Sequence, residues 1–90
     1  LIFAESGEVV EVLELQAGGR NLLVEVPERA WHTLISLEPG TIFFEMKPGP
    51  YAPFSDKDFA SWAPREGDPA VGEFLFWLHR AKVGDIHGRA

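Results

Sequence analysis

Apolar and polar residues alternate along the first 47 residues with the two-residue period of β-strands. Residues 1–4 and 9–15 flank a Ser-Gly pair at positions 6 and 7, which is typical of a hairpin turn. The same alternation recurs in residues 22–26, 31–38 and 41–47. An Ala-Gly-Gly-Arg turn sequence precedes the first of these segments, and a Pro-Gly turn sequence joins the last two. The pattern predicts antiparallel strands over residues 1–47.

Proline interrupts this pattern after residue 47. Residues 48–69 contain five of the seven prolines of the chain, and proline cannot donate a hydrogen bond to a strand ladder. The same segment carries Tyr51, Phe54, Phe59 and Trp62, which make it too apolar for a free linker. We therefore predict an irregular strap, residues 48–68, packed against the sheet.

A helix is predicted over residues 69–83. Asp68 suits the helix cap and Pro69 the first helical position. Gly84 favours a stop after the helix. The predicted apolar stripe consists of Val71, Phe74, Leu75 and Leu78.

Composition limits the classes of function. Ninety residues form one small domain, and the strands, the strap and the helix are expected to share it. The net charge is −6, with 14 acidic and 8 basic residues and no basic cluster, which argues against nucleic-acid binding. No apolar run approaches the roughly 20 residues that span a membrane, so no membrane partner is expected.

The cysteine-free sequence excludes disulfides, thiolate metal sites and cysteine nucleophiles, and it fits the reducing cytoplasm. The chain begins with Leu-Ile-Phe-Ala, already in strand-like sequence. We therefore expect it to be part of a longer protein.

His32 is the first candidate for a functional residue. It stands near the start of a predicted strand, five residues after Pro27, where an imidazole can project into the mouth of a barrel and bind a metal. In a strand, His32 shares a face with Leu34 and Ser36, opposite Trp31, Thr33, Ile35 and Leu37. The plainer interpretation is a histidine that packs on Trp31 or caps the strand end.

Glu45 and Lys47 are the second candidates, because residues two apart in a strand share a face. An inward glutamate is suited to acid–base chemistry or to binding a sugar hydroxyl. The lysine could pair with this glutamate or hold an anionic group of a substrate, and Tyr51 could add a hydroxyl group. The alternative is an exposed ion pair of little energetic value. His79 and His87 are expected to be structural, His79 near the helix C-terminus.

Several stretches resemble the WbuC-like cupin-fold metalloproteins of the cupin superfamily. They are Trp-His-Thr-Leu (31–34), Leu-Glu-Pro-Gly-Thr (37–41), Phe-Glu-Met-Lys-Pro-Gly-Pro-Tyr (44–51), Asp-Lys-Asp-Phe (56–59), Trp-Ala-Pro (62–64) and Glu-Gly (66–67). Pro27 and His32 also match the second cupin motif, while Asn21, Arg29 and Ser36 depart from it. The resemblance implies an all-β fold: the second half of a cupin-type jelly-roll barrel, then the strap and the helix.

The resemblance further implies a divalent transition metal in the intact protein, with His32 as one ligand. Cupins take their other ligands from a His-x-His…Glu motif, which would lie upstream of Leu1, and residues 1–31 contain no histidine. Because metal sites need three or four ligands, we expect weak metal binding or none in this chain. The resemblance also implies action on a sugar or sugar nucleotide in surface-polysaccharide synthesis, with Glu45, Lys47 and Tyr51 as candidate catalytic residues.

Two hypotheses on function follow from these patterns. The first is a metal-dependent cupin enzyme acting on a sugar-like molecule. The second is a non-catalytic β-barrel module for binding or assembly that uses no metal. In either case we expect a homodimer or higher oligomer through unpaired β-edges, at residues 1–4 and at the strand of residues 22–26.

Overall fold

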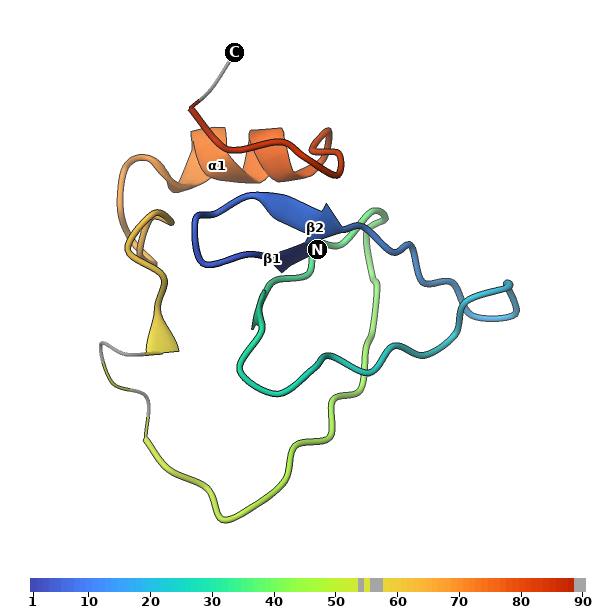
Figure 1. Ribbon diagram of the computed structural model, residues 1–90. Helices are drawn as coiled ribbons and strands as arrows, with labels where there is room; N and C mark the ends of the chain where they lie inside the picture. Colours follow the sequence, from blue (N-terminus) through green and yellow to red (C-terminus); the bar gives the residue numbers. More distant parts are fainter. Residues whose placement is uncertain (54, 56–57, 89–90) are drawn as a thin grey trace.

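The computed structural model describes residues 1–53, 55 and 58–88. Within these residues the chain forms three short strands and one helix (Figure 1): β1 (Ile2–Phe3), β2 (Val9–Glu11), β3 (Trp31–His32) and α1 (Val71–Leu78). The strands form an antiparallel sheet in the order β2-β1-β3. Phe3 is the central residue, opposite Val9 on one side and Trp31 on the other.

The predicted hairpin at the start of the chain is present. The Gly7 nitrogen donates to the Ala4 carbonyl oxygen at 3.0 Å, and Gly7 has a φ of 90°, a conformation that glycine adopts at little cost. The hairpin makes β1 the middle strand, hydrogen-bonded on both sides. The expectation of an unpaired edge at residues 1–4 is therefore wrong.

The chain after the helix closes the outer side of β2. The Gly84 nitrogen donates to the Val9 carbonyl oxygen at 2.7 Å, and the Val9 nitrogen donates to the Asp85 carbonyl oxygen at 2.9 Å. Farther on, the His87 ring meets the rings of Phe74 and Trp77 edge-on, at centroid distances of 5.1 and 5.2 Å. The C-terminal segment thus ties the helix to the sheet.

One small core lies between the sheet and α1, which runs beside β2 in Figure 1. Its buried members come from β1, β2, the helix and the residues after it: Phe3, Val9, Phe74, Trp77, Leu78 and Ala81. Leu1, Trp31, Ile35, Trp62 and Ala63 pack around them. The predicted apolar stripe of the helix was wrong at two positions. It left out Trp77, which is buried, and it included Leu75, which is 44% exposed.

The helix is shorter than predicted. It begins at Val71 after Ala70, and the Asp68 carboxylate accepts a hydrogen bond from the Ala70 nitrogen at 2.8 Å, so Asp68 and Pro69 form the turn before the helix. It ends at Leu78, where the His79 ring nitrogen Nδ1 donates to the Leu75 carbonyl oxygen at 2.8 Å. This contact agrees with the structural role expected for His79.

The predicted jelly-roll barrel is not formed. The described residues contain an open three-stranded sheet and one short helix. Residues 22–26 and 41–47, all of them described, form no strand, and residues 31–38 form one only at Trp31–His32. The physical reason is that these apolar residues have no second layer of chain to pack against, since most of them are exposed.

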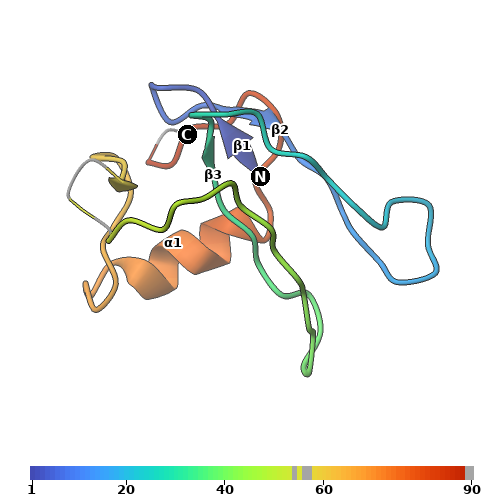
Figure 2. The same ribbon diagram turned by 90° about the horizontal axis from the view of Figure 1, so that it is seen from below.

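Two arms leave the sheet instead (Figure 2). The first arm is residues 12–26, whose tip is held by a 2.9 Å hydrogen bond from the Gln16 nitrogen to the Asn21 carbonyl oxygen. The second arm is residues 33–51, which turns near Thr41, whose hydroxyl donates to the Glu38 carbonyl oxygen at 2.6 Å. Alternation in sequence therefore marks extended chain here, without strand pairing within the described molecule.

Among the described residues of the strap, those in its later part pack on the core. Trp62 and Ala63 contact the core, whereas the Tyr51 side chain is 86% exposed. The Trp62 ring lies against Phe3, with centroids 4.9 Å apart, and its Nε1 donates to the Glu5 carbonyl oxygen at 2.9 Å. Phe54, which was also expected to pack here, lies outside the described residues, as do Asp56 and Lys57 of the cupin-like stretches.

Candidate functional site

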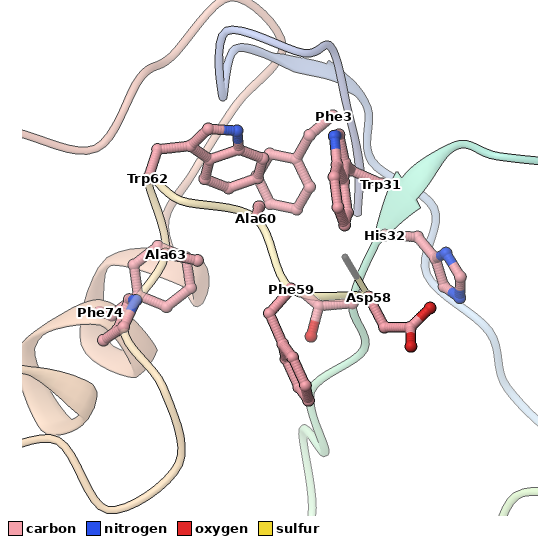
Figure 3. Close-up of a pocket in the computed structure, with 11 residues that line it drawn as sticks. Phe3, Trp31, His32, Asp58, Phe59, Ala60, Trp62, Ala63 and Phe74 are labelled. Atoms are coloured by element: carbon pink, nitrogen blue, oxygen red, sulfur yellow. The ribbon is translucent and has the colours of Figure 1, made fainter. Parts of the chain in front are cut away.

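A cleft of about 400 Å³ opens between β3 and the strap (Figure 3). Its aromatic lining comes from the sheet, the strap and the helix: Phe3, Trp31, Phe59, Trp62 and Phe74. Its remaining lining consists of His32, Thr33, Asp58, Ala60, Ala63 and Pro64. This volume and mostly apolar lining, with few polar groups, are typical of sites for small ligands.

The rings around the cleft are fixed by contacts on their outer sides. In the view of Figure 3, Trp62, Phe3 and Trp31 form a row, and Phe59 lies across from them. Trp62 is held by its hydrogen bond to Glu5 and by the ring of Phe3. The Arg65 guanidinium lies 4.8 Å from the Phe59 ring centre, within the range of a cation–π contact. These contacts orient Trp62 and Phe59 around the cleft.

His32 contributes a hydrogen-bond acceptor to the cleft. Its Nδ1 lies 3.0 Å from the Ala30 carbonyl oxygen, and because a carbonyl only accepts, Nδ1 must carry the proton. In the neutral ring, Nε2 then bears a lone pair. The side chain is exposed, and in Figure 3 its ring projects from β3 on the side away from Trp31, so this nitrogen is available as an acceptor at the edge of the cleft.

Asp58 contributes the carboxylate. Its Oδ2 accepts from the Ser55 nitrogen at 2.6 Å and from the Ser55 hydroxyl at 3.4 Å, which orients the group. Within the described part of the chain, Oδ1 accepts no hydrogen bond. Asp58 and His32 thus bring two acceptors to a cleft whose other lining side chains are mainly aromatic and apolar.

The structure does not bring the other predicted site residues to the cleft. Glu45 and Lys47 pair with each other on the second arm, with Nζ and Oε1 3.1 Å apart and both side chains largely exposed. Neither of them lines the cleft, nor does Tyr51. A common cavity for His32, Glu45 and Lys47 is therefore not formed, because residues 41–47 do not return to pair beside β3.

A metal site is not assembled by the described residues. No group of three or more His, Asp and Glu side chains lies close enough there to hold an ion. His32 brings one nitrogen, and Asp58 is the other side chain with a ligating group among those that line the cleft. Two donors fall short of the three or four that metal sites use, so the donor set present does not fit a bound metal.

The sequence interpretation missed most of this cleft. Phe59 and Trp62 were assigned only to packing. Trp31 and His32 leave β3 on opposite sides in Figure 3, as the alternation predicts, and both still line the cleft. The available signal was the cluster of Asp58, Phe59 and Trp62 in a segment otherwise rich in proline.

We expect His32→Ala to change the free energy of unfolding by less than about 0.5 kcal/mol, because the side chain is exposed. Ile35→Ala should cost about 1–2 kcal/mol, since Ile35 packs half-buried against the core. Urea denaturation of the two variants measures both values. An equal loss in both would show that His32 is a packing residue.

Comparison of the chain with protein-family models, with curated proteins and with solved structures found no match. The resemblance to WbuC-like cupins therefore stays a prediction from the sequence. Among the described residues, no helix is long and apolar enough to cross a membrane.

Proposed function

We propose that this chain is a non-catalytic binding module that holds a neutral, sugar-like ligand in the cleft between β3 and the strap. The observation that carries the proposal is the combination of Trp31, Phe59 and Trp62 with the acceptors of His32 and Asp58 in one cleft. Aromatic rings cover the apolar C–H faces of a sugar ring, and carboxylate and imidazole acceptors bind its hydroxyl groups.

Charge favours a neutral ligand over a sugar nucleotide. The described lining residues include no Lys or Arg, and Asp58 places a carboxylate in the cleft. The chain as a whole carries a net charge of −6. Proteins bind phosphates through arginine, lysine or backbone N–H groups. A phosphate group would meet the Asp58 carboxylate here, and the nearby Arg65 guanidinium lies against the Phe59 ring and is not a lining residue.

The same geometry supports binding rather than catalysis. The predicted catalytic residues Glu45, Lys47 and Tyr51 lie outside the cleft lining, and the donors beside it fall short of a metal site. A metal-dependent enzyme remains a prediction for a longer protein that brings the expected upstream ligands. We propose a cytoplasmic location, because a sequence without cysteine suits a reducing compartment.

Tryptophan fluorescence offers a direct test. Trp31 and Trp62 line the cleft, whereas Trp77 is buried in the core. We expect millimolar concentrations of at least one of glucose, galactose, N-acetylglucosamine and rhamnose to change the emission in a saturable way. Glucose 1-phosphate should bind more weakly than glucose because of the Asp58 carboxylate.

Two variants connect the signal to the cleft. Trp31→Ala should weaken sugar binding at least tenfold, or by about 1.4 kcal/mol, when binding is followed by calorimetry. Phe76→Ala removes an aromatic ring that is 67% exposed on α1 and does not line the cleft, so it should leave the affinity unchanged. No saturable binding of any of these sugars, or equal affinity of Trp31→Ala and the parent chain, would refute the proposal.

A further inference from the structure

The molecule exposes far more surface than a compact protein of its mass. Its accessible area is 7985 Å² for 10.0 kDa, whereas a folded monomer of this mass exposes about 5,200 Å². The excess is about 2,700 Å². The radius of gyration, 13.9 Å, likewise exceeds the roughly 12 Å expected for 90 residues.

The second arm carries the most exposed apolar side chains of this surface. Ile42, Phe44 and Met46 are 94%, 88% and 84% exposed, and in extended chain these alternate residues lie on one face. Soluble monomers rarely expose a contiguous apolar patch of this kind, which usually marks an interaction surface.

The backbone of the same segment is also available for pairing. Residues 42–46 form no backbone hydrogen bond with the described part of the chain. Extended chain with open N–H and C=O groups is a template for a further strand. Residues 42–46 therefore offer both an apolar face and backbone groups that no ladder of the described chain uses.

We propose that residues 41–47 form an antiparallel strand pair with the same residues of a second copy of this chain, with Phe44 opposite Phe44. Two-fold symmetry about Phe44 places each residue opposite the one that lies equally far on the other side of Phe44 in the second copy. In this register Ile42 faces Met46 of the other copy, so all three cross-strand pairs on that face are apolar. This face of the segment is thus complementary to itself, while the other face places Phe43 opposite Glu45 and Thr41 opposite Lys47.

Local charge is compatible with this partner. Each copy has a net charge of −6, but Glu45 and Lys47 neutralise each other within the segment, at 3.1 Å. The two chains therefore meet where their local charges balance.

Sedimentation velocity and light scattering test the assembly. We expect the parent chain at micromolar concentration to have twice the 10.0 kDa mass of one chain. Phe44→Asp should give a monomer, because it places two carboxylates opposite each other at the centre of the pair. The fold should survive, since Phe44 is 88% exposed. Phe76→Asp, an equivalent change at an exposed position on α1, should leave the dimer intact.

Cysteine cross-linking tests the register, because the chain has no cysteine of its own. Phe44→Cys should form a disulfide dimer on mild oxidation, since directly opposite Cα atoms lie about 4.5–5.5 Å apart. Ile42→Cys should not, because its two copies would be four residues out of register, about 13 Å apart. A monomeric parent chain, a dimer that survives Phe44→Asp, or faster cross-linking at position 42 than at position 44 would overturn the proposal.

Discussion

Replacing Phe74 by alanine is expected to lower the free energy of unfolding by about 3–5 kcal/mol. Phe74 is 9% exposed and belongs to the core between α1 and the sheet. Its ring also contacts Trp77, with centroids 5.6 Å apart, and the His87 ring that ties down the C-terminal segment. The deletion therefore leaves a cavity in a core with few other members to close it.

Phe76→Ala is the matched control, because it deletes the same side chain two residues away on the same helix. Phe76 is 67% exposed, and its ring contacts the Arg80 guanidinium at 5.1 Å. The loss should be about 1 kcal/mol or less, the value of an exposed cation–π contact. Urea denaturation measures the free energy of unfolding of both variants. One fixed protein concentration keeps any contribution of self-association the same for the two. If the two variants lose equal stability, the packing of α1 on the sheet is not what holds the fold together.

Gly7→Ala is expected to be the most damaging change in a loop. Gly7 has a φ of 90°, and an added Cβ would lie 3.0 Å from Cδ2 of the Trp62 ring. The ring cannot move aside easily, because its Nε1 donates a hydrogen bond to the Glu5 carbonyl oxygen and the tilted ring of Phe3 packs against it. The variant should lose about 1–2 kcal/mol to backbone strain and about 1–3 kcal/mol more to overpacking.

Gly67→Ala separates these two effects. Gly67 has nearly the same φ, 85°, but an added Cβ would meet no atom of the described chain within 4 Å. It should therefore show the strain alone, about 1–2 kcal/mol. Thermal or urea unfolding of both variants gives the difference, which is the value of the close approach of Trp62. No difference would mean that the strap does not press on the β1–β2 hairpin.

The sequence by itself determined the local elements whose signals are short in range. The Ser-Gly turn specified the β1–β2 hairpin, with Gly7 at positive φ. The Asp68-Pro69 pair marked the turn before α1, and the arrangement of apolar residues placed Phe74 and Leu78 on its buried face. These features depend on a few neighbouring residues, and backbone sterics and helical periodicity are enough to fix them.

The alternation of apolar and polar residues did not determine whether the middle of the chain forms strands. Residues 22–26 and 41–47 have the pattern of half-buried strands, yet they are extended and exposed in the structure. A strand needs a partner for its ladder and a layer for its apolar face, and neither is encoded in its own residues. This is why the barrel expected from the cupin resemblance is absent from the described molecule.

Only the tertiary structure decided the candidate site. The cleft combines Trp31 and His32 of β3 with Asp58, Phe59 and Trp62 of the strap, segments more than twenty residues apart in the chain. The tertiary structure also separated His32 from Glu45 and Lys47, because the second arm does not pair beside β3. Contacts between distant segments depend on how the whole core packs, so residue spacing alone could identify His32 but not its neighbours.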